Sequence, residues 1–370
     1  MNHKERVLRA INFEEPDRVP IGEFGFHITP YIQLCRYFGI DNPEELYWSG
    51  CWRFLKENLR KKALAFREKL GTDLFGVWVN IELFEGSPKP LSDGRLMDVW
   101  KVIYKPSPNV TAPQPVEHPL KTPDDLDVYE FPDFSHAAFD FLDKFLKLYK
   151  DDYAIYSGFG WTLFERSWYL RGFEQLIIDM YRNPGFVEKL MDKIVDYDVK
   201  LAKMVVERDI DIFFVGDDFG SQHGLLIPPS LWRKFIKPRM KKILQPARKK
   251  GLPILLHSDG DVTSIIDDLI ELGVTILNPV QPLIVNPAEL REKYGENLSF
   301  YGTIDVQKTL PFGSVEDVKK EVMDHIKGCG YNGGLIVAPS HTILPGIPIE
   351  NILAISETAK KYGRYPVIIK

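Results

Sequence analysis

The chain has 370 residues, a length that a single α/β barrel reaches once loops are added. Hydrophobic residues make up 44% and charged residues 27%, which is ordinary for a globular protein in water. The net charge of -5 and a pI near 6.0 exclude the basic footprint of a nucleic-acid-binding protein.

The cysteines and the N-terminal residues predict the cellular compartment. Cys35, Cys51 and Cys329 are the only cysteines, and no two of them form a C-x-x-C pair, so a disulfide framework is not expected. Residues 1–20 lack the apolar core of a secretory signal. No apolar run approaches the roughly 20 residues that span a bilayer. We expect a soluble, cytoplasmic protein.

Short apolar segments alternate with longer amphipathic ones and predict a parallel α/β fold. Several of the expected strands, such as Ile212-Phe213-Phe214-Val215, are hydrophobic without interruption, as in strands buried on both faces. The eight expected strands are residues 18–25, 73–80, 153–157, 211–216, 253–257, 274–278, 298–301 and 334–338. Eight such units predict a single (β/α)₈ barrel domain over residues 1–370. An open doubly wound sheet is the alternative, although no G-x-G-x-x-G follows the first strand.

Residues 81–152 interrupt this rhythm. They contain Ser87-Pro88-Lys89-Pro90, a Ser92-Asp93-Gly94 turn, a strand-like stretch at 97–104 and a Pro-rich stretch at 106–115. We interpret the region as an elaborated loop with a hairpin after the second strand, and not as a second domain.

His257 and Asp259 stand where the fifth strand ends. Side chains two residues apart point the same way along a strand, so both are predicted to face the mouth of the barrel. An imidazole and a carboxylate there could bind a divalent metal or act as an acid–base pair. The alternative is that Asp259 or Asp261 caps the next helix and His257 packs in the core.

His341 ends the eighth strand, which faces the fifth strand across the mouth of a closed barrel. Together with His257 and Asp259 it makes a set of two histidines and one carboxylate that suits zinc or iron. Taken alone, His341 is more typical of a structural or substrate-contacting residue.

Asp217 and Asp218 follow the fourth strand. Adjacent side chains point in opposite directions, so only one of the two is expected to face the mouth. That carboxylate could serve as a general base or a fourth metal ligand. A loop ion pair together with a helix cap is an equally good interpretation.

Aromatic residues and one amide gather at or just beyond the predicted strand ends. Core packing is the commoner role for such aromatic rings, but a mouth lined this way would suit a flat apolar substrate. The residues predicted to bind substrate are Phe24, Phe159, Trp161, Gln281 and Tyr301.

Motifs along nearly the whole chain resemble those of one enzyme superfamily. They are Arg6-Val7-Leu8, Asp17-Arg18-Val19-Pro20, Gly158-Phe159, Trp161-Thr162-Leu163, Gly216-Asp217-Asp218, His257-Ser258-Asp259-Gly260, Asn278-Pro279-Val280-Gln281-Pro282, Gly302-Thr303-Ile304-Asp305, Pro339-Ser340-His341 and Glu350-Asn351-Ile352. The chain thereby resembles the uroporphyrinogen decarboxylase superfamily. That resemblance implies a (β/α)₈ barrel.

Within this superfamily the chain departs from the true decarboxylases. Their substrate-binding M-R-Q-A-G-R-Y motif is replaced by residues 21–27, which contain no arginine, and their essential aspartate is replaced by Asn80. A tetrapyrrole with many acidic groups would meet too little positive charge. The chain is more similar to the corrinoid-dependent methyltransferases, whose zinc-binding members use H-x-C on the fifth strand and a cysteine on the eighth. Here His257 is retained, Asp259 stands at the first cysteine position and His341 stands near the second.

The resemblance implies a metal-dependent methyltransferase of the O-demethylase type. Zinc on His257, Asp259 and His341 would polarise the oxygen of a small, aryl methyl ether, with Asp217 or Asp218 as the acid. A cob(I)alamin nucleophile would take the methyl group. Because no corrinoid-binding domain is visible in the chain, we expect a separate corrinoid protein to dock at the mouth.

Two alternatives from other classes stay open. A metal-free decarboxylase or lyase acting on a smaller carboxylic acid would use His341 and Asp217 as acid and base. A non-catalytic binding protein would use the aromatic pocket alone. The sequence also leaves the oligomeric state open, a homodimer included.

Overall fold

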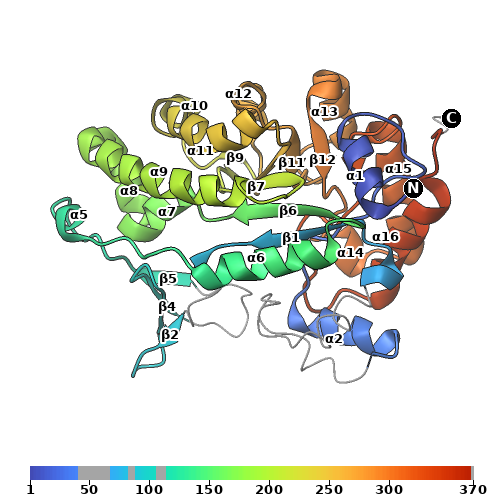
Figure 1. The fold of residues 1–370 in the computed structure, drawn as a ribbon, viewed down its shortest axis with the longest axis horizontal. Helices are drawn as coiled ribbons and strands as arrows, with labels where there is room; N and C mark the ends of the chain where they lie inside the picture. The colour runs from blue at the N-terminus through green and yellow to red at the C-terminus, as the bar shows by residue number, and fades with distance from the viewer. Residues whose placement is uncertain (41–66, 82–87, 106–113, 368–370) are drawn as a thin grey trace.

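A curled parallel sheet of seven strands runs through the centre of the computed structural model, which describes residues 1–40, 67–81, 88–105 and 114–367 (Figure 1). The strand order is β1-β6-β7-β10-β11-β12-β13, and each neighbouring pair is parallel. The strands are β1 (Leu74–Trp78), β6 (Ala154–Phe159), β7 (Ile212–Gly216), β10 (Ile254–His257), β11 (Ile276–Asn278), β12 (Ser299–Tyr301) and β13 (Leu335–Ile336).

Helices cover the outer face of this sheet (Figure 1). The longer ones are α6 (His136–Tyr149), α7 (Leu163–Arg171), α8 (Phe173–Arg182), α9 (Pro184–Val206), α11 (Lys237–Lys250), α12 (Ile266–Leu272), α13 (Pro287–Tyr294), α15 (Val315–Cys329) and α16 (Ile349–Tyr362). Short α10 (Pro229–Leu231), the π-helix at Trp232–Ile236 and α14 (Thr309–Phe312) complete the layer, with single 3₁₀ turns at Thr263–Ile265 and Gly295–Asn297. No helix in the described part of the chain is long and apolar enough to cross a membrane.

The first expected strand, residues 18–25, is not a regular strand. Isolated bridges occur there instead, between Arg18 and Arg364, between Ile21 and Val337 and, just beyond the segment, between Phe26 and Ile343. The backbone of Pro20 and Gly22 nevertheless hydrogen-bonds to Val337, and the carbonyl of Ile21 accepts from Asp73 at the other edge. An irregular segment therefore joins the two edges of the seven-stranded sheet, where the sequence predicted an eighth strand.

Strand alternation divides the apolar residues into an inner and an outer core. Leu255 belongs to the inner cluster and its neighbour Leu256 to the outer one, between sheet and helices. The same division separates Phe214 from Phe213. The inner cluster consists of Val7, Ile11, Leu74, Ala154, Tyr156, Ile212, Phe214, Leu255, Ile276, Tyr301, Ile336 and Ala338. The sheet thus encloses packed side chains, as in an α/β barrel.

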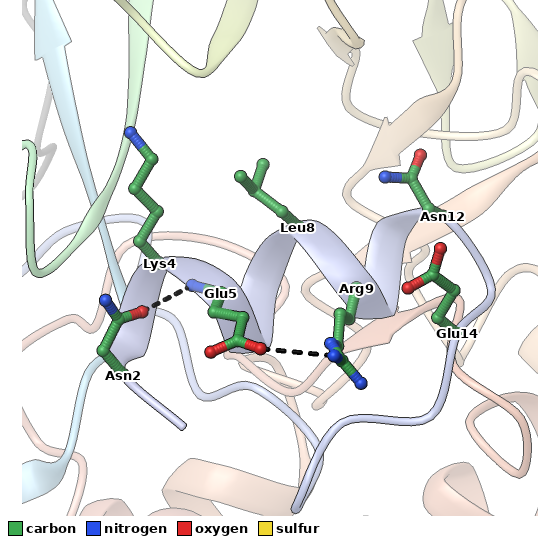
Figure 2. A pocket seen from close by; sticks show the side chains of 7 residues that line it. All are labelled: Asn2, Lys4, Glu5, Leu8, Arg9, Asn12 and Glu14. Atoms are coloured by element: carbon green, nitrogen blue, oxygen red, sulfur yellow. Dashed lines mark hydrogen bonds and ion pairs between the residues drawn. The ribbon is translucent and has the colours of Figure 1, made fainter.

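Helix α1 (His3–Ile11) covers the amino ends of the strands. Asn2 caps it, and Val7 and Ile11 enter the inner core. The pocket in Figure 2 runs along its outer side and is lined by Asn2, Lys4, Glu5, Leu8, Arg9, Asn12 and Glu14. Glu5 and Arg9 pair with each other there, while Lys4 pairs with Asp211. The pocket therefore lies at the end of the sheet opposite His257.

Residues 81–152 contain more regular structure than a loop with one hairpin. A four-stranded antiparallel sheet is formed by β2 (Lys89–Pro90), β3 (Leu96–Met97), β4 (Ile103–Lys105) and β5 (Gln114–Glu117). The stretch expected as one strand at 97–104 is divided by a turn in which Lys101 has a φ of 62°. Short α5 (Asp125–Val128) and the long α6 follow, because apolar residues recur with helical spacing in His136–Tyr149.

Asp73, fully buried just before β1, binds two arginines and one histidine. Its Oδ1 accepts from Arg6 and lies 2.7 Å from His3 Nδ1, while its Oδ2 accepts from Arg18 and from the backbone of Ile21. Burial acts to raise the pKa of Asp73. The hydrogen bond from His3 and the charges of Arg18 and Arg6 outweigh it, so the pKa lies below its usual value.

We expect Asp73→Asn to lower the free energy of unfolding by about 3–5 kcal/mol at pH 7, because buried Arg6 and half-buried Arg18 would lose this counter-charge. A lowered carboxyl pKa stabilises the fold above the unfolded-state value near 3.9 and loses that effect as the pH falls through the folded-state value. The deficit of the variant should therefore shrink below about pH 4. Urea unfolding at pH 7 and pH 3.5 measures both.

The matched control is Asp93→Asn, which removes an exposed carboxylate that pairs with Arg95 on the antiparallel sheet. Its unfolding midpoint should barely change. Equal stabilities for the two variants would contradict the role given to Asp73.

Candidate active site

His257, Asp259 and His341 come together at the carboxyl ends of the strands. One ligand-type atom from each residue lies within 4.8 Å of the other two. His341 Nε2 is 3.5 Å from Asp259 Oδ2, and the two imidazole centroids are 5.8 Å apart. His257 ends β10, whereas His341 follows the bridge that pairs Ile304 with Pro339 beyond β13. The curl of the sheet brings these two distant strand ends to one place.

The loop that carries Asp259 is held on several sides. The backbone N–H of Asp259 donates to Asp218 Oδ1 and that of Gly260 donates to Gln281 Oε1, each at 2.8 Å. The N–H of Asp261 donates to Ser221 O in the small hairpin of β8 (Gly220–Ser221) and β9 (Gly224–Leu225). A Cβ at Gly260 would lie 2.4 Å from the hairpin backbone, so only glycine permits this approach. The backbone that carries Asp259 is thus fixed by its neighbours.

The two adjacent aspartates have separate surroundings. Asp217 is fully buried, and its carboxylate accepts from the backbone of Phe164 and Glu165 in the first turn of α7, which is the helix-cap alternative. Asp218 instead approaches the histidines, with its Oδ1 3.9 Å from His257 Nε2. Burial raises the pKa of Asp217 to about 7 and also raises the pKa of Asp218. Of the two, Asp218 is the one that faces the candidate site.

Aromatic rings form a wall beside the histidines. Phe24 stacks on His257 with a centroid distance of 4.5 Å and lies 5.6 Å from His341. Trp78 contacts Phe24 edge-on at 5.7 Å, and Trp161 in turn contacts Trp78 at 6.4 Å. The rings therefore continue outward from the histidines in the order Phe24, Trp78, Trp161.

Three residues predicted to bind substrate have other contacts. Phe159 points outward into the helix–sheet core against Phe213, because it alternates with the inward-facing Gly158. Tyr301 is fully buried in the inner core and donates its hydroxyl to Glu23 O at 2.6 Å. Gln281 accepts from the Gly260 backbone. Phe159 is thus turned away from the histidines, while Tyr301 and Gln281 support the segments that carry Phe24 and Asp259.

The histidine–carboxylate set fits a divalent metal. Asp259 Oδ1 is buried and has no hydrogen-bond partner among the described residues, which is costly for a carboxylate oxygen unless something else neutralises it. Ligand atoms about 2 Å from one zinc ion are separated by less than about 4 Å, so the observed set needs only a small inward movement. Burial also lowers the pKa of His341, which favours the neutral imidazole that metals bind.

Comparison with known proteins gives the family. Residues 103–362, more than half of the chain, match the family described as uroporphyrinogen decarboxylase (URO-D). The chain belongs to the URO-D family. Its fold is similar to that of a methyltransferase from Methanosarcina mazei, with a TM-score of 0.71 and 20% sequence identity over 98% of this chain and 99% of that one.

Relatives of this URO-D family member include two kinds of enzyme. The methylcobamide:CoM methyltransferase MtaA of Methanosarcina barkeri is 26% identical over 47% of the chain, and the match spans only about half (49%) of that protein. The uroporphyrinogen decarboxylase of Crocosphaera subtropica is 21% identical over 91% of the chain and 97% of its own length.

Sequence reasoning missed Glu165, which lies in the first turn of α7 and accepts from the Asp218 backbone at 3.2 Å. Burial, followed by the charges of Asp218 and Asp217, raises the pKa of Glu165 well above its usual value. The sequence signal was weak, because a glutamate near a helix start is more often an exposed residue that favours the helix dipole. The carboxyl groups of Glu165, Asp217 and Asp218 are therefore close enough to influence one another, and Asp218 lies beside His257.

Asn80, which replaces the essential aspartate of true decarboxylases, has a structural role in this URO-D family member. Its side-chain amide donates to Gly160 O at 2.9 Å and accepts from Gly160 N at 3.0 Å. The next residue, Trp161, has a φ of 49°, a conformation that a bulky residue rarely adopts. Asn80 thus helps to hold the turn that presents Trp161.

Asp217→Asn should lower the stability of the fold, whereas Asp218→Asn should weaken zinc binding. An amide at 217 leaves one buried N–H of α7 without an acceptor, which costs about 1–3 kcal/mol of unfolding free energy. At 218 the amide oxygen still accepts from Asp259, so stability is kept, but the loss of charge beside His257 should weaken zinc binding by about tenfold. Urea unfolding and zinc titration against a chromophoric chelator measure the two effects. Loss of zinc affinity in Asp217→Asn with unchanged stability would contradict this division.

Proposed function

We propose that this protein is a zinc-dependent methyltransferase that transfers a methyl group from a small aryl methyl ether to a reduced corrinoid carried by a separate protein. The observation that carries the proposal is the convergence of His257, Asp259 and His341, where the buried Asp259 Oδ1 has no partner within the described part of the chain. Similarity to the methyltransferase MtaA within the URO-D family supports the reaction class.

The chain's own residues would hold the metal and leave it a free position. Two imidazoles and one carboxylate are three protein ligands, the number found in catalytic zinc sites, which keep a fourth position for water or substrate. Lewis-acid polarisation of the ether oxygen is the chemistry that zinc supplies in such a site. Because none of these three ligands is a thiolate, the set is harder than the one with two cysteines and suits an oxygen donor.

The aromatic wall would bind the ring of the substrate. Phe24 and Trp78 lie next to the histidines, and Trp161 extends the wall outward. An aryl group packed there places its ether oxygen toward Asp259 and excludes water from the reacting atoms.

Asp218 would manage the proton of the leaving group. The methyl group would pass to the reduced corrinoid of the partner protein, the electron pair of the broken C–O bond would stay on the ether oxygen, and a proton at that oxygen would complete the phenol. The raised pKa of Asp218, due first to burial, favours a carboxyl group that can hold that proton. Asp217 supports this arrangement indirectly by capping α7, the helix that carries Glu165. The corrinoid protein would dock over the carboxyl ends of the strands.

Purified protein prepared without chelator should contain about one zinc per chain. His257→Ala should lose the zinc and reduce methyl transfer to cob(I)alamin by about 1,000-fold or more, because Lewis-acid stabilisation is worth several kcal/mol of barrier. Trp161→Ala should instead raise KM by roughly tenfold with little change in kcat, since only apolar contact is lost. Elemental analysis and assays on a panel of aryl and alkyl methyl ethers measure these effects.

The control is Tyr181→Ala, which removes an exposed aromatic ring on α8 and should leave zinc content and kinetics unchanged. Zinc-loaded wild-type protein that transfers no methyl group from any ether would contradict the proposal. Carbon dioxide release from small carboxylic acids by metal-free protein would favour the decarboxylase or lyase alternative.

A further inference from the structure

Asn278 contacts His257 because the two residues are register partners on adjacent parallel strands. β10 and β11 pair His257 with Asn278, so both side chains point to the inner face and meet there. His257 Nδ1 lies 2.6 Å from Asn278 Oδ1, and Asn278 is completely buried. On the other side of His257 the register partner is Gly216, which has no side chain to compete for the ring.

The orientation of the Asn278 amide follows from its second contact. Its Nδ2 lies 2.7 Å from Tyr301 O, and a backbone carbonyl can only accept a hydrogen bond. The NH₂ group must therefore face Tyr301, which leaves the amide oxygen facing His257. Since that oxygen can also only accept, the proton of the His257 ring must be on Nδ1.

Gly302 provides the space for this amide. It has a φ of 80°, and a Cβ at this position would lie 3.0 Å from Asn278 Nδ2 and 2.8 Å from Pro339 O. A side chain there would push the amide away from Tyr301. The glycine after β12 and the asparagine at the end of β11 thus act together.

We infer that Asn278 is a positioning residue that fixes the tautomer of His257, so that the unprotonated Nε2 is presented to Asp259 and His341. This inference rests on the proposed metal site and adds Asn278 as the residue that orients His257 for metal binding. Metal-binding histidines commonly donate their other ring N–H to an acceptor, which orients the ring and fixes the tautomer. The contact therefore suits His257 as a metal ligand through Nε2.

Two variants separate the hydrogen bond that the Asn278 side chain accepts from the volume that it fills. Asn278→Leu keeps the approximate volume and removes the acceptor, whereas Asn278→Asp keeps an oxygen facing His257. Asn351→Leu is the matched control, because Asn351 is also buried and its amide donates to the carbonyls of Leu310 and Gly313 in the outer layer. Each protein is titrated with zinc against a chromophoric chelator. In metal-free protein, ¹⁵N-histidine spectra report the tautomer, with His257→Gln to assign the signal.

The wild-type spectrum should show His257 protonated at Nδ1, and Asn278→Leu should lose this preference and bind zinc about 10- to 100-fold more weakly. Asn278→Asp should stay within about tenfold of wild type, and Asn351→Leu should match wild type in both measurements. An unchanged tautomer and zinc affinity in Asn278→Leu would overturn the inference and leave the proposed function intact. Wild-type protein that binds no zinc would overturn the proposed function, while the tautomer in metal-free protein would still decide the role of Asn278.

Discussion

The buried carboxylate of Asp73 is the interaction on which the arrangement of the curled sheet depends. It binds Arg6 of α1, Arg18 of the irregular segment and the backbone of Ile21, and it stands at the first residue before β1. The segment it holds is the one that joins the two edges of the seven-stranded sheet. A charge buried this deeply is tolerated only with its partners in place. Asp73 therefore holds α1 and the irregular segment against the start of β1.

Joining the edges of the sheet has a direct effect on the site. Just beyond Gly22 the segment carries Glu23, whose carbonyl accepts from Tyr301 inside the barrel, and Phe24, which stacks on His257. The same closure sets Val337 beside the segment, and His341 follows four residues later. The Asp73 network at the amino ends of the strands is therefore connected, through a few residues of irregular backbone, to the positions of Phe24 and His341 at the carboxyl ends.

The parts of the site that follow from strand alternation could be predicted from the sequence. His257 and Asp259 are two residues apart and His341 was predicted to end the last strand, so a barrel would bring them together. Phe159 was placed wrongly for the same physical reason: the strand continues to that residue and turns its ring outward. Asn278 could have been found from the register of β10 and β11. The contacts of Glu165 and Asn80 could not, because they depend on how the loop after β6 folds back on its neighbours.

The three candidate ligands differ in how firmly they are held, and this difference suits a site that must both bind and react. His257 is held by Asn278 and Phe24, and its side chain is only 10% exposed. Asp259 and His341 belong to loops, and their side chains are 36% and 38% exposed. The inward movement that a metal requires therefore falls on the half-buried side chains of Asp259 and His341, while His257 provides the fixed point. His257 lies on a strand, whereas Asp259 and His341 lie on loops. The open side of the site therefore faces the carboxyl ends of the strands, where a methyl donor and a methyl acceptor can approach.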